Sequence, residues 1–172
     1  MHETIPRRSL PGFTIRSASQ DDVPLIHAFI LGLARFERLE HECLATEEAL
    51  QDTLFGLRPY AEVLIGEFEG TPVGFALFFH NYSTFLAKPG IYLEDIYVDP
   101  TWRGRGFGTA FLTQVADLAV ARGCGRLEWS VLDWNENAIR FYERHGAVLM
   151  SEWTTMRVTG EALTALSGGT DA

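Results

Sequence analysis

The first half of the chain alternates between helical and strand-like patterns of apolar residues. Apolar positions recur at helical spacing from about Ser19 to Leu39, which predicts a first helix. A second, shorter helix is predicted from Thr46, a capping residue, to about Gly56. Two β-rich runs follow over residues 61–68 and 73–79, and the turn residues between them favour an antiparallel hairpin.

The second half of the chain reads as strand, helix and strand again. A strand over 92–98 leads through a glycine-rich stretch into a helix that ends near Arg122, and a strand over 127–131 should complete a right-handed βαβ unit. Asn135 is expected to cap a further helix that closes at Gly146. The last strands are predicted at 148–150 and 153–158, before a weak helical tail. This order indicates one mixed α/β domain over residues 13–172, after a flexible arm of residues 1–12.

Composition narrows the class of protein. The chain has 172 residues, of which 47% are hydrophobic and 22% charged, and its net charge is −9. No apolar run approaches the roughly 18 residues that a membrane span needs, and an acidic chain argues against a nucleic-acid partner. The two cysteines, Cys43 and Cys124, suit reduced thiols in a cytoplasmic protein. The histidines show no ligand-like clustering, so no metal is expected.

The glycine-rich stretch, RGRGFGT over residues 103–109, lies between a predicted strand and a predicted helix. Glycines at a helix start leave backbone N–H groups free to bind phosphate. A G-x-x-x-x-G-K-[ST] loop is absent, and the dinucleotide motif G-x-G-x-x-G fails at Thr109, although Glu128 keeps an oxidoreductase open as a minor alternative. The pattern that does match is R-x-x-G-x-G.

This pattern resembles the pyrophosphate loop of the GNAT superfamily of acyl-CoA-dependent N-acetyltransferases. The family pattern continues with a strand and an Asn-led helix that carries Phe-Tyr and ends in Gly, as residues 131–147 do here. The segments LARFERLE, IYLEDIYV and VLDWN resemble more closely the diamine (spermidine/spermine) and thialysine acetyltransferases. The resemblance implies the GNAT fold, with a mixed, mostly antiparallel sheet of about six to seven strands and about four helices. It also implies acetyl-CoA as co-substrate and a homodimer.

The resemblance assigns the acyl-CoA site to the strand, the loop and the later helix. Main-chain groups at the end of the strand would pair with pantetheine as a neighbouring strand does, and the loop would hold the pyrophosphate. For the loop arginines and for the capping Asn135, a purely structural role is the alternative. The expected cofactor-binding residues are Ile96, Tyr97, Val98, Arg103, Gly104, Arg105, Gly106, Phe107, Gly108, Thr109 and Asn135.

Two residues are the candidates for proton transfer. An amine attacks a thioester only as the neutral base, so its proton must first be removed, and a nearby carboxylate can take it directly or through water. Glu94 is the candidate because strand alternation places it on one face with Tyr92, Ile96 and Val98. Its alternative is a structural acid, a role that is assigned to Asp95. Tyr142 holds the family's proton-donor position, and its alternative is a core aromatic.

The acceptor is expected to be a small cationic amine. Phe36 and Glu37 fall where the diamine enzymes line their amine pocket, and Glu94 and Glu152 are further candidates for substrate contact. The diamine enzymes carry an acidic doublet before Gly-Trp, whereas this chain has only Ser151-Glu152-Trp153, which argues against long polyamines. A non-catalytic acyl-CoA sensor, or a GNAT enzyme acting on a protein N-terminus or an aminoglycoside, remains the alternative.

Overall fold

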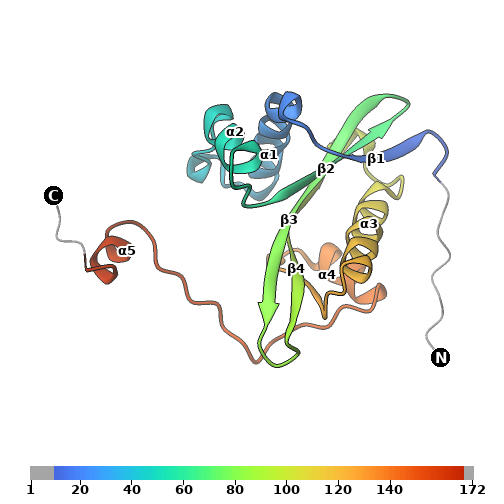
Figure 1. Ribbon diagram of the computed structural model, residues 1–172. Helices are drawn as coiled ribbons and strands as arrows, with labels where there is room; N and C mark the ends of the chain where they lie inside the picture. The colour runs from blue at the N-terminus through green and yellow to red at the C-terminus, as the bar shows by residue number, and fades with distance from the viewer. Residues whose placement is uncertain (1–9, 169–172) are drawn as a thin grey trace. The chain divides into compact units, whose positions relative to one another are not determined.

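Five strands form one mixed sheet in chain order (Figure 1). They are β1 (Phe13–Ser17), β2 (Glu62–Phe68), β3 (Thr71–Ser83), β4 (Lys88–Val98) and β5 (Leu127–Trp129). The first four pair antiparallel, and β5 pairs parallel to β4. This computed structural model describes residues 10–168, and all five strands belong to the first of two compact units, Met1–Ser130 and Val131–Ala172. The predicted mixed, mostly antiparallel sheet is confirmed.

Three α-helices belong to this first unit: α1 (Val23–Glu37), α2 (Glu47–Phe55) and α3 (Phe107–Ala121). Pro24 lies in the first turn of α1, where a missing N–H costs least. Thr46 caps α2, because its side-chain oxygen accepts a hydrogen bond from the backbone N–H of Ala49 at 3.2 Å. Short 3-10 turns lie at Gln20–Asp22, Glu40–Glu42 and Pro100–Trp102. The helices predicted in this half of the chain are confirmed.

The two faces of the sheet are covered by different helices. On one face, Ile65, Phe75 and Tyr97 pack with Ile26 and Phe29 of α1 into a buried cluster. Here Gly32 of α1 lies directly on Tyr97, and a Cβ at position 32 would overlap the Tyr97 hydroxyl.

On the other face, Gly66 of β2 lies beneath α3. A Cβ at position 66 would come within 2.6 Å of the Phe111 ring, so this strand position requires a residue without a side chain. Figure 1 shows α1 and α2 on one side of the strands and α3 on the other.

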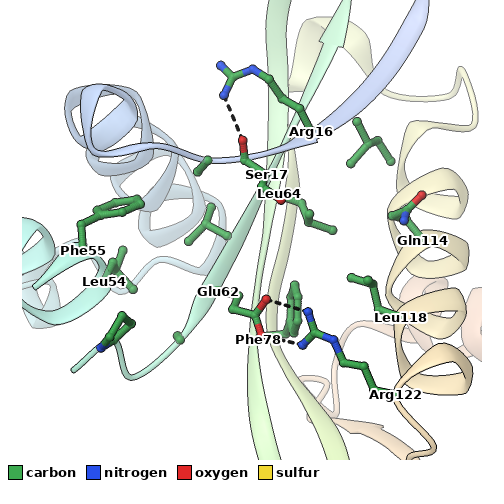
Figure 2. Close-up of a pocket in the computed structure, with 15 residues that line it drawn as sticks. Arg16, Ser17, Leu54, Phe55, Glu62, Leu64, Phe78, Gln114, Leu118 and Arg122 are labelled. Carbon is green, nitrogen blue, oxygen red and sulfur yellow. Dashed lines mark hydrogen bonds and ion pairs between the residues drawn. The ribbon is translucent and has the colours of Figure 1, made fainter. Parts of the chain in front are cut away.

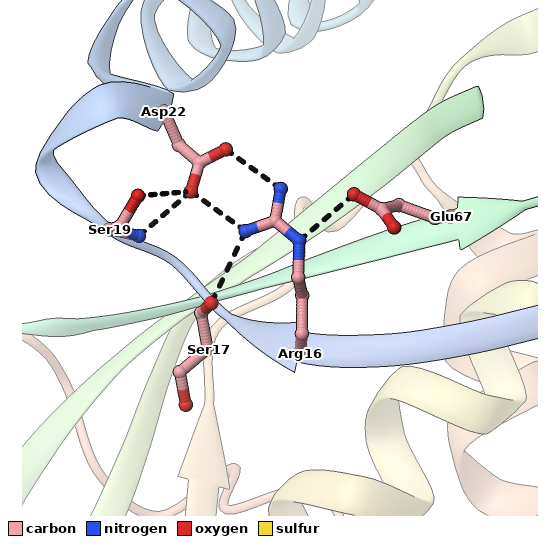
Figure 3. A network of polar contacts seen from close by, with 5 residues as sticks. All are labelled: Arg16, Ser17, Ser19, Asp22 and Glu67. Atoms are coloured by element: carbon pink, nitrogen blue, oxygen red, sulfur yellow. Dashed lines mark hydrogen bonds and ion pairs between the residues drawn. The ribbon is translucent and has the colours of Figure 1, made fainter. Parts of the chain in front are cut away.

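A polar network ties β1 to the start of α1 (Figure 3). The Arg16 guanidinium donates two hydrogen bonds to Asp22, at 2.7 and 2.8 Å, and a third to Glu67 of β2 at 2.9 Å. Asp22 also accepts a hydrogen bond from the backbone N–H of Ser19 at 2.7 Å. The hydrogen bonds from Arg16 are the main reason that the pKa of Asp22 falls to about 2.

The second unit contains α4 (Glu136–Arg144) and the short α5 (Gly160–Leu166). Asn135 caps α4 as predicted, because its side-chain oxygen accepts a hydrogen bond from the N–H of Ala138 at 3.3 Å. Helix α5 corresponds to the predicted weak tail and brings the α-helices of the described chain to five rather than about four.

The strands predicted at 148–150 and 153–158 are absent from the described chain, so that prediction was wrong. A strand needs a partner for its backbone groups, and no described strand pairs with these residues. Their apolar side chains, including those of Val148, Met150 and Trp153, are exposed. The sheet therefore has five strands rather than six to seven. Of the predicted N-terminal arm, residues 1–9 lie outside the described residues, and the single domain over 13–172 stays a prediction.

Candidate functional site

The edge of β4 is open where the sequence places the pantetheine contacts. Strand β5 pairs with β4 only from Ile91 to Leu93, whereas β4 continues to Val98. No described strand pairs with this edge over residues 94–98. The carbonyl oxygen of Val98 is available to a side chain, since it accepts a hydrogen bond from Nε of Arg103 at 2.9 Å. An extended amide-containing ligand can therefore add to this edge as a strand does.

The glycine loop presents an open anion site at the start of α3. Gly104 and Gly106 have φ values of 78° and 91°, which only glycine adopts without strain, and Gly106 is the N-cap of α3. A Cβ at Gly104 or Gly108 would meet no atom within 4 Å, so the space beside both backbones is open. The first N–H groups of α3 have no partner within the helix, and together with the helix dipole they favour a phosphate here.

Two of the predicted cofactor contacts, Tyr97 of β4 and Phe107 of the loop, are available through the backbone alone. The Phe107 side chain is buried and stacks on Phe13, with ring centroids 4.2 Å apart. The Tyr97 side chain is likewise buried, on the α1 face of the sheet. Of the residues expected to bind the cofactor, these two therefore have side chains committed to the core.

The two loop arginines lie over aromatic rings. Arg103 has its guanidinium carbon 4.5 Å from the centroid of Phe36 and 5.8 Å from that of Tyr97. Arg105 lies 4.7 Å from the ring of Trp102 and also faces Phe68, at 5.7 Å. The loop thus reaches the last turn of α1, the segment predicted to line the amine pocket.

A β-bulge interrupts β4 at Glu94. The register pairs Phe78 with Leu93 and Leu77 with Asp95, so Glu94 is the additional residue of the bulge. The expected alternation, which placed Tyr92, Glu94, Ile96 and Val98 on one face, is therefore broken, because Tyr92 lies on the opposite face from Ile96 and Val98.

The bulge changes which side chains share a face of β4. Asp95 lies on the same face as Tyr92 and Tyr97, the face that α1 covers, because all three pair with the alternate residues Leu77, Phe79 and Phe75 of β3. Bulges commonly re-aim a side chain beside an active site.

Asp95 is the most perturbed carboxyl group of this region. Burial, together with the nearby charges of Glu94 and Glu37, raises its pKa to about 7. Burial also raises the pKa of Glu37 at the end of α1. From the sequence, Asp95 was given a structural role. The signal that could have marked it as a site residue is that it is a second acidic residue inside a largely apolar strand. The structure thus couples Glu37, Glu94 and Asp95 electrostatically, close to Phe36.

The remaining predicted site residues belong to the second unit. Tyr142 lies on α4 with its ring centroid 5.2 Å from that of Phe141, and burial raises the pKa of its hydroxyl. A phenol with a raised pKa is protonated at neutral pH and can donate a proton. Glu152 is exposed in a turn after α4.

The first unit contains a cavity of about 350 Å³ (Figure 2). It opens between the end of β1, the C-terminal part of α2, the start of β2 and α3, and none of the predicted site residues line it. The bidentate ion pair between Glu62 and Arg122, with contacts of 2.6 and 2.8 Å, lies at its wall. The candidate site is therefore a surface along β4 and the loop, separate from this cavity.

Among residues 10–168 there is no group of three or more His, Cys, Asp or Glu side chains placed to hold a metal ion. No helix in that part of the chain is long and apolar enough to cross a bilayer.

Comparison with known proteins identifies the family. The family model described as acetyltransferase (GNAT) family matches residues 30–147. The chain belongs to the GNAT acetyltransferase family. The first unit therefore carries the GNAT strand, loop and helix, and the open edge of β4 lies where the family resemblance places acyl-CoA.

Individual GNAT relatives are similar over nearly the whole chain. The L-ornithine N5-acetyltransferase NATA1 of Arabidopsis thaliana is 39% identical, over 95% of this chain and 93% of the relative. The thialysine N-epsilon-acetyltransferase of Mus musculus is 38% identical, over 90% of this chain and 96% of the relative. A solved integron cassette protein from the mobile metagenome of V. cholerae shares the fold, with a TM-score of 0.77 and 24% identity over 91% of this chain and 98% of that one. This GNAT chain is thus an N-acetyltransferase by family.

Proposed function

We propose that this enzyme transfers an acetyl group from acetyl-CoA directly to the primary amine of a small cationic molecule of the thialysine, lysine or short diamine type. The observation that carries the proposal is the acidic group formed by Glu37, Glu94 and Asp95 beside the open edge of β4. The amine substrates in the names of the similar enzymes, ornithine and thialysine, belong to the same chemical class.

The first unit fits the co-substrate at two places. The open edge of β4 at Ile96 and Val98 suits the amides of pantetheine, and the space at Gly104 and Gly108 suits the pyrophosphate. Acetyl-CoA supplies the activated acetyl thioester. Neither cysteine is proposed as an acyl carrier, because both are partly buried and lie outside these segments, so transfer is direct.

The acidic residues attract the amine and deprotonate it. An aliphatic ammonium has a pKa of roughly 10, so it must lose a proton before it attacks. Asp95 is suited to accept that proton because a base works best with a pKa near the working pH, and its own is raised to about 7. Glu94, exposed at the bulge, is proposed to attract the ammonium and to pass its proton on to Asp95.

Three residues of the second unit complete the proposal. On the basis of the family resemblance, the Tyr142 hydroxyl donates a proton to the departing sulfur. Asn135 contacts the pantetheine in addition to capping α4, and Glu152 contacts the amine.

We also propose a cytoplasmic homodimer. The exposed apolar residues of 148–158 support the dimer, because such a segment usually marks an interaction surface.

The deciding experiment is an amine panel. The protein is incubated with acetyl-CoA and thialysine, lysine, ornithine, putrescine, spermidine or an aminoglycoside, and free CoA is measured as thiol. We expect fast release with thialysine, ornithine or a short diamine. Tight acetyl-CoA binding in calorimetry without thiol release from any amine would instead identify a non-catalytic sensor.

A further inference from the structure

The cavity between α2 and α3 is large enough to hold one small molecule (Figure 2). Its volume of about 350 Å³ falls within the roughly 300–1,000 Å³ that small-molecule sites occupy. It forms where β1 ends at Ser17, opposite Leu64, while β2 extends further to Glu62. None of the residues predicted to bind acetyl-CoA or the amine lines it, so the proposed reaction assigns it no ligand.

Most of the cavity wall is apolar and already formed. Leu54 and Phe55 of α2 lie on one side of the cavity, and Leu118 of α3 lies on the other (Figure 2). Leu64 of β2 and Phe78 of β3 line it in between, and the Phe78 side chain is fully buried. An apolar group that enters this space is therefore removed from water against an existing apolar surface.

One ion pair lies at the cavity wall. Glu62 accepts hydrogen bonds from both terminal nitrogens of Arg122, at 2.6 and 2.8 Å. The side chains of Glu62 and Arg122 are 48% and 31% exposed, so a solute can reach both charges. Glu62 takes two of the five N–H donors of the guanidinium, and each carboxylate oxygen can accept a second hydrogen bond, so the pair can bind a ligand while it stays intact. Arg16 also lines the cavity, but its guanidinium is bonded to Asp22 and Glu67.

An ion pair beside an apolar space is complementary to a ligand that carries both charges on an apolar body. A simple cation would be repelled by Arg122, and a simple anion would be repelled by Glu62. A zwitterion avoids both repulsions, because it places its carboxylate on Arg122 and its ammonium on Glu62. Its apolar remainder then lies against the apolar wall.

We propose that this cavity binds a free α-amino acid with an apolar side chain. Arg122 binds its carboxylate, Glu62 binds its ammonium, and its side chain packs against Leu54, Leu64 and Leu118. This site goes beyond the proposed function, because the acetyl acceptor binds beside β4 and the amino acid in the cavity is a second ligand that is not acetylated there.

Calorimetry with three ligands of similar shape tests the proposed charge pairing. L-leucine carries both charges, isocaproate lacks the ammonium, and isoamylamine lacks the carboxylate. We expect the parent protein, without acetyl-CoA, to bind L-leucine with a dissociation constant below about 1 mM and each analogue at least about tenfold more weakly. No binding of L-leucine, or equal binding of either analogue, would overturn the proposal.

Variants test whether L-leucine binds in the cavity. Glu62→Gln and Arg122→Gln each remove one charge and should weaken L-leucine binding by about tenfold or more. Leu118→Trp keeps the ion pair but fills the space, and it should abolish binding. Arg126→Gln is the matched control, because it breaks an ion pair of similar exposure with Glu128 outside the cavity and should leave L-leucine binding unchanged.

Asp95→Asn distinguishes the cavity from the acceptor site. We expect this variant to bind L-leucine within about twofold of the parent, because Asp95 does not line the cavity. Loss of binding in Asp95→Asn, or full binding in any of Glu62→Gln, Arg122→Gln and Leu118→Trp, contradicts the cavity site. Thiol release from the amine panel is a separate result, and its absence would overturn the proposed function without affecting this site.

Discussion

At the scale of single residues, two adjacent carboxyl groups have different surroundings because of one extra residue in β4. The bulge leaves Glu94 exposed and turns Asp95 toward the face that α1 covers. Without the bulge, the side chains of Glu94 and Asp95 would simply alternate between the two faces of β4. The pKa of about 7 at Asp95 is therefore a property of the strand geometry as much as of the residue.

For Asp95→Asn, we expect kcat to fall by about 100-fold, because the variant lacks the proposed proton acceptor. In the parent, activity should rise with pH through about 7 as Asp95 loses its proton. Initial rates from pH 5.5 to 9 test this. Glu94→Gln is the matched control and should weaken amine binding while keeping a rise in activity that moves to lower pH, because the charge of Glu94 helps to raise the pKa of Asp95. An unaltered profile in Asp95→Asn would remove this residue from the mechanism.

Asp95→Asn should lower activity, but it should not lower the stability of the protein at pH 8. A raised pKa in the folded state means that Asp95 favours folding below its unfolded pKa of about 4 and that this contribution is lost as pH rises through about 7. The free energy of unfolding of Asp95→Asn should therefore match or exceed that of the parent at pH 8. Urea unfolding at pH 5 and pH 8 measures it, and a loss that is larger at pH 8 would contradict the assigned burial.

Tyr142→Phe should lower kcat by about 100-fold while the dissociation constant of acetyl-CoA stays within about twofold, because only the proton donor is lost. Thiol release and calorimetry give the two numbers. Phe141→Leu, a change to the neighbouring ring, serves as control for packing of α4. Equal losses in both variants would make Tyr142 a packing residue.

At the scale of secondary-structure elements, the caps and turns were readable from the sequence. Thr46, Asn135 and the turn between β2 and β3 carry local signals, and the structure confirms each of them. The bulge at Glu94 carries none, because it depends on the register with β3. The strands predicted at 148–150 and 153–158 have the right composition, but a strand also needs a partner, which a local pattern does not reveal.

The position of the candidate site was predicted from the loop and strand, whereas its contacts were not. The sequence places Arg103 in a phosphate loop, and the structure adds that its guanidinium faces Phe36, 67 residues earlier in the chain. Contacts of such separation depend on how α1 packs on the sheet. The same packing explains why Asp95, given a structural role in the sequence, is the carboxyl with the raised pKa.

The junction of β1 and α1 gives a prediction for acid stability. Asp22→Asn removes the charge that Arg16 binds, and should lower the free energy of unfolding by about 1 kcal/mol at pH 7. Because the pKa of Asp22 is lowered to about 2, its contribution is present above about pH 4 and is lost as pH falls through 2. The difference from the parent should therefore shrink below pH 3 in urea unfolding. Glu48→Gln, an exposed acid, should show no such trend.

At the scale of the whole molecule, the exposed apolar segment 148–158 predicts association. Trp153 is 76% exposed, which is costly for a ring of this size in a monomer. Trp153→Glu should shift the sedimentation of the protein from dimer toward monomer, because it places a charge in the proposed interface. Glu152→Gln is the control. The dimer would be contradicted if the parent protein sedimented as a monomer at about 50 μM, a typical assay concentration.

The absence of a side chain at Gly32 has a consequence for how substrate choice can change. Tyr97 lies directly under that glycine, and the Arg103 guanidinium lies 5.8 Å from the centroid of the Tyr97 ring and 4.5 Å from that of Phe36. Any side chain at position 32 must push α1 outward or displace Tyr97, and either movement alters the spacing between Phe36 and Asp95. Under the proposed function, the preferred length of the amine can therefore change through position 32 of α1 while every acid of the site stays the same.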